Sequence, residues 1–165
     1  MKRSLLLSIW VISAILIFTI LAGGCISFLT PFIETEIKQM LDDLGEANVN
    51  GDVDQIIIHY TDPITEVNHL SGETSITSLE EKRIEIEDML TYYHCLIDDF
   101  YNEEITTLNT TNAIVECDEH VKFQDLLDEV IYYESIDRVK LTLIKIDGDW
   151  KVSIYELIDT EEVIP

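Results

Sequence analysis

Basic residues are scarce in this chain, which has only 10 Lys and Arg against 33 Asp and Glu and a formal net charge of −23 at pH 7. A domain this negative repels phosphate backbones and anionic lipid headgroups, and no basic stripe is present to override that field. The composition therefore excludes nucleic acid as a partner. It leaves cations, basic proteins and neutral small molecules.

Several motifs that mark catalytic or metal sites are also missing. The sequence has no Cys-x-x-Cys, no phosphate-binding loop, no Gly-x-Ser-x-Gly, no His-Glu-x-x-His and no EF-hand loop. Glu116, Asp118 and Glu119 lie close together, but on a strand the first two share the outer face while Glu119 points inward. We therefore predict a solvated acidic face, with no metal and no cofactor.

Cysteine is rare as well, with 3 residues in the whole chain. Two of them, Cys95 and Cys117, lie in the acidic part, where an oxidising environment would allow a disulfide. The alternative is two small buried side chains. We favour the buried thiols, because the predicted strand pairing does not place the two residues opposite each other.

A long uncharged run near the N-terminus, Leu5 to Ala22, follows the basic pair Lys2 and Arg3. Eighteen helical residues span about 27 Å, which is close to the hydrocarbon thickness of a bilayer. Basic residues before such a run stay in the cytoplasm. Residues 1–24 are therefore predicted to be a signal peptide or membrane anchor, with the rest of the chain on the extracytoplasmic side of the cell membrane.

The end of this run, Leu21-Ala22-Gly23-Gly24-Cys25, resembles the lipobox of prokaryotic lipoproteins. The resemblance implies cleavage before Cys25 and lipidation of its thiol. The sequence departs from the commonest lipobox, since Ala22 stands where Leu is usual. An uncleaved single-pass anchor, or a helix buried in a soluble protein, are the alternatives. The triplet Asn109-Thr110-Thr111 is a glycosylation sequon that fits an exported protein.

The acidic part is predicted to form one domain over residues 32–159, joined to the leader by a tether at 25–31 and followed by a tail at 160–165. Three helices are expected before the main sheet. The first has an apolar face with helical spacing, the second follows Asp52 as its cap, and the third follows the capping box of Ser78 and Glu81. Residues 64–75 are ambiguous, with a short strand over 64–70 as one interpretation.

The remaining chain alternates as strands do. Apolar and polar residues alternate from Ala113 to Phe123, which indicates a sheet with one covered face. Asp147-Gly148 predicts a two-residue hairpin turn that pairs Ile146 with Asp149. The same register would place Lys140 opposite Tyr155.

Together these segments resemble the NTF2-like superfamily, the cone fold of SnoaL-like and ketosteroid-isomerase-like domains. The resemblance rests on the first helix and the Ala47–Asp54 segment that follows it, on the long helix before the sheet, and on the closing hairpin, Leu143–Val152. It implies an α+β fold in which three helices pack on the concave side of a curved antiparallel sheet. It also implies a pocket between helices and sheet, but no single activity.

Four residues near the expected pocket could serve as catalytic groups: His59, Asp62, Tyr93 and His94. Each has a structural explanation, such as packing for Tyr93 and a helix C-terminus for His94. We therefore predict a noncatalytic, membrane-tethered domain, not an enzyme, that binds a small ligand or a second copy of the chain. The alternative is an isomerase, dehydratase or hydrolase that uses a His or Asp of the cone.

Overall fold

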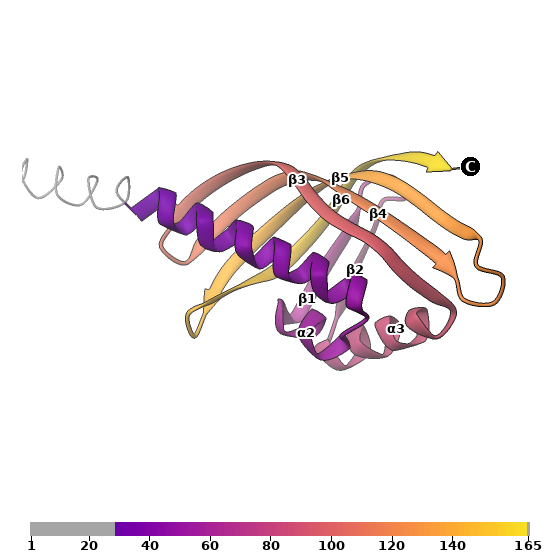
Figure 1. Ribbon diagram of the computed structural model, residues 1–165. Helices are drawn as coiled ribbons and strands as arrows, with labels where there is room; N and C mark the ends of the chain where they lie inside the picture. The colour runs from indigo at the N-terminus through magenta and orange to yellow at the C-terminus, as the bar shows by residue number, and fades with distance from the viewer. Residues whose placement is uncertain (1–28, 165) are drawn as a thin grey trace, which may run out of the picture.

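The computed structural model describes residues 29–164 and shows three helices beside one six-stranded sheet (Figure 1). The first helix occupies residues 29–50. The other elements follow in the order α2 (Val53–Ile58), β1 (Tyr60–Asn68), β2 (Glu73–Thr77), α3 (Leu79–Tyr92), β3 (Tyr93–Asn109), β4 (Asn112–Asp125), β5 (Ile131–Ile146) and β6 (Asp149–Ile164).

The predicted leader and lipidation residue, 1–24 and Cys25, lie outside the described residues. In the part that the structure describes, no helix is both long enough and apolar enough to cross a bilayer. Of the predicted tether, residues 29–31 belong to the first helix. The predicted tail is not separate from the domain, because β6 continues through Thr160 to Ile164 and pairs there with β5.

The strands lie in the order β2-β1-β6-β5-β4-β3. All neighbours are antiparallel except β1 and β6, which are parallel. This confirms the predicted α+β class with a mainly antiparallel sheet, and it corrects the order of elements. The ambiguous segment 64–75 is part of a hairpin of β1 and β2, so two strands precede α3. The chain between the parallel neighbours β1 and β6 runs through β2, α3, β3, β4 and β5, which is long enough to bring β6 back beside β1 in the same direction.

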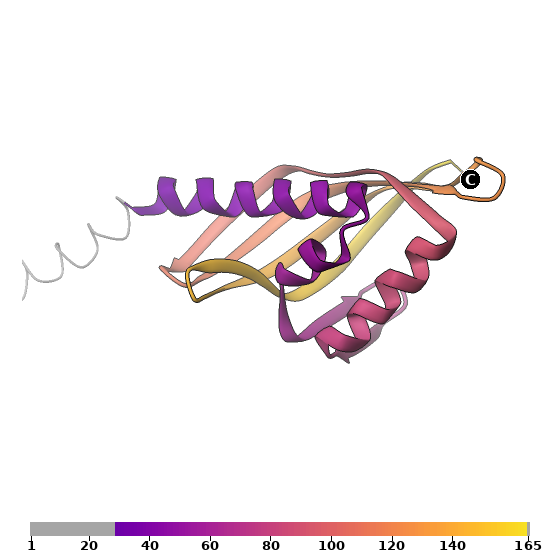
Figure 2. The ribbon, with the colours of Figure 1, turned by 60° about the horizontal axis from the view of Figure 1, so that its bottom comes forward.

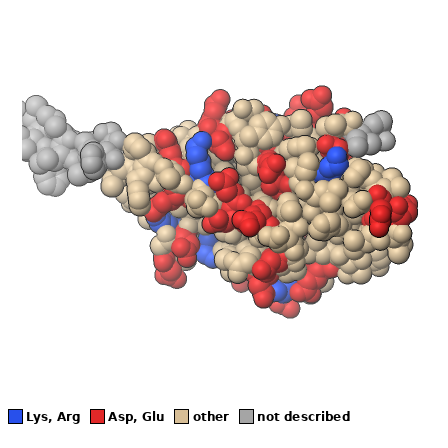
Figure 3. All heavy atoms as spheres, viewed as in Figure 1, with Lys and Arg blue, Asp and Glu red and all other residues tan. Residues whose placement is uncertain are grey.

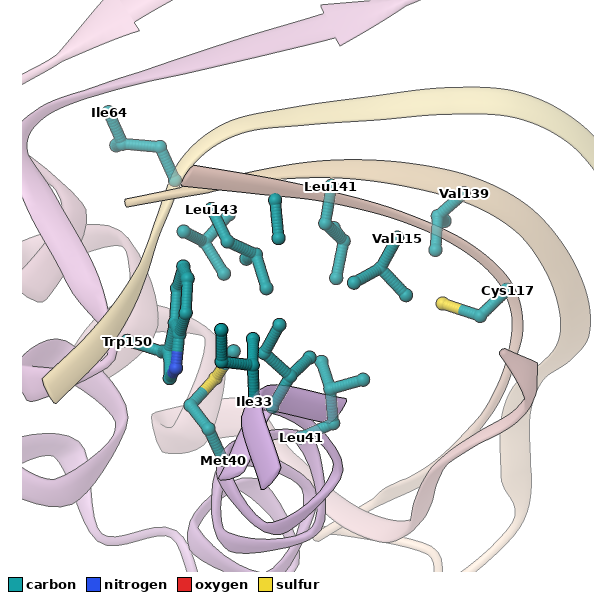
Figure 4. Packing of buried hydrophobic residues seen from close by; sticks show 13 residues of the cluster. Ile33, Met40, Leu41, Ile64, Val115, Cys117, Val139, Leu141, Leu143 and Trp150 are labelled. Atoms are coloured by element: carbon teal, nitrogen blue, oxygen red, sulfur yellow. The ribbon is translucent and has the colours of Figure 1, made fainter. Parts of the chain in front are cut away.

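All three helices lie on one side of the sheet (Figure 2). The first helix points its apolar face at the sheet, and its residues Ile37 and Leu41 are fully buried in the main core cluster. Figure 4 shows Leu41 facing the sheet residues Val115 and Leu143. Trp150 closes this core beside the β5–β6 hairpin. A second, smaller cluster joins the helices to each other through Leu44, Ala47, Ile56, Ile57 and Ile86.

The predicted caps are present. The Asp52 side chain accepts from the backbone N–H of Gln55, and Ser78 and Glu81 form the reciprocal capping box at the start of α3. Gly45 lies where the first helix crosses β3, and a Cβ placed there would lie 2.2 Å from the backbone oxygen of Asp98. A residue without a side chain is therefore required for this close helix–strand contact.

The β5–β6 hairpin begins in the predicted register and then changes. Ile146 pairs with Asp149 and Leu143 with Val152, as expected, but a bulge follows and Leu141 pairs with Tyr155. The predicted pairing of Lys140 with Tyr155 is therefore wrong by one residue. Because side chains alternate along a strand, the bulge moves Tyr155 from the outer face to the concave face.

The disulfide considered for Cys95 and Cys117 is not formed, and both thiols are free and buried. Cys95 pairs with Phe123 on β4. Phe123 lies six residues from Cys117 along that strand, or about 20 Å at strand spacing. The two cysteines fill space in the interior, as the preferred interpretation had it.

Among the charged groups on the face shown in Figure 3, acidic ones outnumber basic ones. The basic side chains are engaged rather than free. On the outer face of the sheet, for example, Arg138 contacts Asp118 at 3.1 Å and Lys140 contacts Glu156 at 2.8 Å. Because acidic residues far outnumber basic ones, these ion pairs leave the surface with a large net negative charge.

Candidate functional site

The concave face of the sheet changes from apolar to polar along its strands. On β4 and β5 the inward residues are apolar under the first helix and become acidic or hydroxylic beyond it, at Glu119, Asp137 and Ser135. Glu119 pairs directly with Asp137 across the two strands. The interior therefore has a filled apolar half and a buried polar half, and the polar half is the candidate functional site.

A connected row of four polar side chains crosses this half, and we call it the polar chain: Asn48, Asp98, Glu119 and Tyr155. Nδ2 of Asn48 donates to Oδ2 of Asp98 over 2.5 Å. A hydrogen bond joins the carboxyl groups of Asp98 and Glu119. Oη of Tyr155 donates to Oε2 of Glu119 over 2.5 Å. The row links the first helix to β6 through β3 and β4.

The two carboxyl groups of the polar chain are almost out of reach of water. Asp98 is 5% exposed and Glu119 is 8% exposed. Desolvation by burial raises the pKa of Asp98 to about 6. Burial, together with the nearby charge of Asp98, raises the pKa of Glu119 well above its ordinary value. Two adjacent buried carboxyls cannot both ionise cheaply, so the pair retains a proton.

That proton has a definite place. Oδ1 of Asp98 is buried, and apart from the carboxyl group of Glu119 no side chain or backbone N–H of residues 29–164 is placed to donate to it. The hydrogen bond between the two carboxyl groups lowers the pKa of Asp98 and raises the pKa of Glu119. Glu119 therefore holds the proton and donates it to Asp98. In the polar chain, Tyr155 donates to Glu119, Glu119 donates to Asp98, and Asn48 also donates to Asp98.

Two tyrosines line the same interior. Burial and the neighbouring charge of Glu119 raise the pKa of both Tyr155 and Tyr60. Both phenols therefore stay neutral and can serve only as hydrogen-bonding groups at ordinary pH. Tyr155 reaches Glu119 only because of the bulge in β6, which turns its ring inward.

Two hollows border the polar chain. Tyr155, at one end of the chain, lines a hollow of about 500 Å³ formed by β1, β2 and β6, with Glu66 and Leu157 beside it. Asp98, the second member of the chain, belongs to the wall of a smaller hollow of about 270 Å³ between the first helix and β3. A ligand in either hollow would therefore lie next to a residue of the polar chain.

The four residues singled out from sequence lie away from the polar chain. His94 and Asp62 are exposed, and Asp62 accepts from the backbone N–H of Leu79 at the start of α3. Tyr93 stacks on Tyr132 with ring centroids 4.4 Å apart. These three positions have local structural roles.

His59 occupies a different feature, an open groove of about 720 Å³ between the first helix and the β5–β6 hairpin. Burial is the largest influence on its imidazole and lowers its pKa, which favours the neutral form. The groove wall carries a compact cluster in which Glu36 accepts from Nζ of Lys145 at 2.5 Å and from Nε1 of Trp150 at 3.1 Å. Nζ of Lys145 also lies 5.5 Å from the centroid of the Trp150 ring.

The sequence did not predict the pairing of Asp98 with Glu119. The usable signal was Glu119, a single acid on the inward side of an otherwise apolar strand. Its partner comes from another strand, and periodicity along one strand cannot identify a neighbour on the next. The sequon residue Asn109 lies at the exposed β3–β4 turn, where its side-chain oxygen accepts from the backbone N–H of Thr111.

Comparison with known proteins supports the fold. No family model and no curated protein sequence matches the chain. Solved structures do match it. A conserved protein from Planctomyces limnophilus has a TM-score of 0.68 at 15% identity, with 79% of this chain and 97% of that chain covered. A ketosteroid isomerase-like protein from Erwinia carotovora atroseptica has a TM-score of 0.60 at 14% identity, with 79% and 96% covered.

An NTF-2 like protein of unknown function from Shewanella oneidensis also matches, with a TM-score of 0.60 at 19% identity and with 76% and 98% of the two chains covered. The chain therefore has the NTF2-like, or cystatin-like, cone fold that its segments resemble. At these identities the likeness concerns the fold alone.

Tyr155→Phe tests whether the polar chain is formed. The substitution removes the phenol that donates to Oε2 of Glu119 and leaves a buried oxygen without that donor. We expect the free energy of unfolding to fall by about 1–3 kcal/mol, measured by urea denaturation at pH 7. Tyr92→Phe, on an exposed ring, is the control and should change stability by no more than about 0.5 kcal/mol. Equal effects of the two substitutions would contradict the assignment.

Proposed function

We propose that this protein is an extracytoplasmic domain, tethered to the cell membrane by its N-terminal segment, that binds a small ligand in the polar half of its cone without transforming it. The tether is supported by the uncharged run Leu5 to Ala22 and the lipobox-like segment ending at Cys25. The binding role is supported by the fold and by the two hollows that border the polar chain at Tyr155 and Asp98.

One observation carries the binding role. The polar chain is a buried row of hydrogen bonds, and two of its members, Tyr155 and Asp98, belong to the walls of the 500 Å³ and 270 Å³ hollows. Buried polar groups of this kind orient a ligand and define its chemistry. No histidine of residues 29–164 belongs to the row. A binding site needs only these fixed donors and acceptors, whereas acid–base catalysis also needs a group that exchanges protons with a substrate.

A second candidate function rests on the Asp98–Glu119 pair. A carboxyl with a pKa of about 6 next to one that keeps its proton is an arrangement that enzymes use for general acid–base catalysis. In this alternative, Asp98 accepts a proton from a substrate in the hollow beside the first helix. It differs from the sequence-based alternative in using neither His59 nor His94.

A ligand screen separates the two functions. The full-length protein in non-ionic detergent is heated with a mixed set of cationic, neutral and anionic small molecules. A ligand of the cone should raise the Tm of the wild type and raise it less in Glu119→Gln. Recovery of the compound unchanged supports the binding function, and its chemical conversion supports the enzyme. A screen in which no compound discriminates between the two proteins would contradict both.

The tether predicts a specific effect of Cys25→Ser. In cells fed a labelled fatty acid, the wild type should carry label in the membrane fraction, and the variant should lose at least about 90% of that label because the acceptor thiol is gone. A Cys95→Ser control should keep its label. If the variant loses label but stays in the membrane, the uncleaved anchor is correct. Unlabelled wild type in the cytosol would overturn the tether.

A further inference from the structure

Exposed apolar side chains gather at one end of the sheet, around the loop that joins β4 to β5. They come from the end of α3, from this loop and from the start of β5, and each is more than half exposed. We call them the apolar tip: Tyr92, Leu126, Leu127, Val130 and Tyr132. Leu127 is the extreme case, at 91% exposed. Single exposed apolar residues are ordinary, but a cluster of them marks an interaction surface.

Contacts between the three segments make the apolar tip one surface. The backbone N–H of Leu126 donates to the backbone oxygen of Tyr92 over 3.0 Å, which joins the loop to the end of α3. Tyr93, the next residue, stacks on Tyr132 with ring centroids 4.4 Å apart, which joins the same place to β5. The exposed side chains are therefore neighbours in space as well as members of one loop.

The loop presents its leucines in a fixed backbone conformation. Oδ1 of Asp125 accepts from the backbone N–H of Leu127 over 2.7 Å, and Oδ1 of Asp128 accepts from that of Val130 over 3.1 Å. The backbone N–H of Asp125 also donates to the backbone oxygen of Val130 over 2.9 Å. Because the backbone is already held, a partner does not have to order the loop, which lowers the entropic cost of binding.

Carboxyl groups flank the apolar tip. Asp125, Asp128 and Glu129 lie in the loop itself, and Asp88 lies one turn before Tyr92 on the same face of α3. In the part of the chain that the structure describes, no Lys or Arg forms an ion pair with any of these carboxyl groups. An apolar centre with an uncompensated negative rim is complementary to a partner that carries Lys or Arg beside apolar side chains.

The position of the apolar tip argues against a lipid surface as its occupant. Lys38 of the first helix pairs with Glu103 near the end of β3, at 3.0 Å, whereas Tyr93, beside the tip, begins that strand. Figures 1 and 2 show the β4–β5 loop at the end of the sheet away from the start of the first helix. The tip is therefore distant from the residues that the proposed tether holds, and its rim repels anionic headgroups.

A second copy of the chain is also disfavoured. Self-association through the apolar tip would place the carboxyl groups of one copy against those of the other, and like charges across an interface oppose association. Size favours a short segment over a large folded surface. Standard protein–protein interfaces use about 20–30 residues on each side, several times more than the five of the apolar tip.

We propose that the apolar tip docks a partner protein through an amphipathic segment in which Lys or Arg side chains flank apolar ones. Leu126, Leu127 and the exposed tyrosines bury the apolar residues of that segment, and the carboxyl groups of the rim pair with its cations. This inference is independent of the proposed ligand site, because no member of the polar chain belongs to the apolar tip.

Three synthetic peptides test this chemistry: an amphipathic helix of leucine and lysine, the same helix with glutamate in place of lysine, and the same helix with serine in place of leucine. The full-length protein is placed in nanodiscs of phosphatidylcholine, which has no net charge, and protein-free nanodiscs are the blank that removes peptide–lipid binding. Fluorescence anisotropy of labelled peptide gives the affinity. The leucine–lysine peptide should bind at least about tenfold more tightly than either of the others, because each of these lacks half of the required chemistry.

Two substitutions with matched controls locate the site. Leu127→Ser changes an exposed side chain, so the fold is kept, and it should weaken binding of the leucine–lysine peptide at least about tenfold. Leu108→Ser, on an exposed leucine at the β3–β4 end of the sheet, should leave that binding unchanged. Glu129→Gln should weaken it about threefold. Asp147→Asn should not, although Asp147 is also an exposed acid with a left-handed backbone beside a hairpin turn.

The outcomes that overturn the proposal are distinct. Failure of the leucine–lysine peptide to bind, equal binding of the glutamate peptide, or equal effects of Leu127→Ser and Leu108→Ser would each do so. A cross-linked dimer of the wild type that Leu127→Ser abolishes would show that the occupant is a second copy. Labelling of residues 125–132 by a photoactivatable phosphatidylcholine in the nanodisc would show that the occupant is lipid.

Discussion

Gly45→Ala is expected to destabilise the protein, although the same change in an ordinary helix stabilises it by about 1 kcal/mol. The reason is steric. The added methyl group would lie 2.2 Å from the backbone oxygen of Asp98, and a strand backbone cannot rotate away as a flexible side chain can. The first helix must then move off β3, which opens the apolar core. We expect the free energy of unfolding to fall by about 2–3 kcal/mol.

Urea denaturation with a fluorescence readout from Trp150 measures this effect. Glu46→Ala, one residue further on the exposed side of the same helix, is the matched control and should change stability by no more than about 0.5 kcal/mol. The Gly45 substitution should also disturb the polar chain, because Asn48 lies one turn later and donates to Asp98. A stabilised Gly45→Ala protein would show that the helix does not cross β3 as closely as described.

Glu119→Gln is expected to change how stability depends on pH. In the folded wild type, the raised pKa values of Asp98 and Glu119 retain protons that the unfolded chain releases near pH 4. The folded state therefore binds more protons above that pH, and the stabilisation is full below pH 4 and is lost as the pH rises through 6 and beyond. Glutamine keeps the hydrogen-bonding shape but cannot ionise, so this loss should largely disappear.

The measured quantity is the difference in unfolding free energy between Glu119→Gln and the wild type, obtained by urea denaturation from pH 4.5 to pH 8. As the pH rises from 4.5 to 8, the variant should gain about 2–3 kcal/mol of stability relative to the wild type. Glu104→Gln, which neutralises an exposed carboxyl on β3, should show a difference that stays constant with pH. Parallel profiles for Glu119→Gln and the wild type would mean that the pair does not hold an extra proton.

Other carboxyl groups act in the opposite direction and set the acidic limit of stability. Lysine, histidine, arginine or amide partners lower the pKa of Glu36, Asp118, Glu134 and Glu156. Their contribution is present above about pH 4.5 and is lost as the pH falls through the lowered values. The two sets together place the stability maximum of the wild type in mildly acidic solution.

Helices and the end of the last hairpin were well predicted because their signals are local. Apolar spacing marked the first helix, and its predicted inner residues Ile37 and Leu41 are fully buried. Ser78 and Glu81 form the expected capping box, since both partners lie within one turn. Asp147-Gly148 determined the turn and the first pairs of the hairpin for the same reason.

The candidate site was predicted only in part. The inward direction of Glu119 follows from alternation along β4, and the structure has it buried. Its partners could not be derived in this way. Asp98 comes from β3 and Asn48 from the first helix, and the contact between them depends on how closely Gly45 lets the helix approach. Tyr155 was assigned to the wrong face, because a bulge in β6 shifts the register by one residue.

By itself the sequence determined the acidic character of the domain, its helices, the alternation of its strands and the resemblance to a cone fold, since each of these depends on neighbours within a few positions. Only the tertiary structure decided that four polar residues from four elements meet in the interior and that β1 lies beside β6. These contacts join residues up to about a hundred positions apart. Their geometry depends on one bulge and one close helix–strand crossing, and neither feature can be recognised from the periodicity of apolar residues in the sequence.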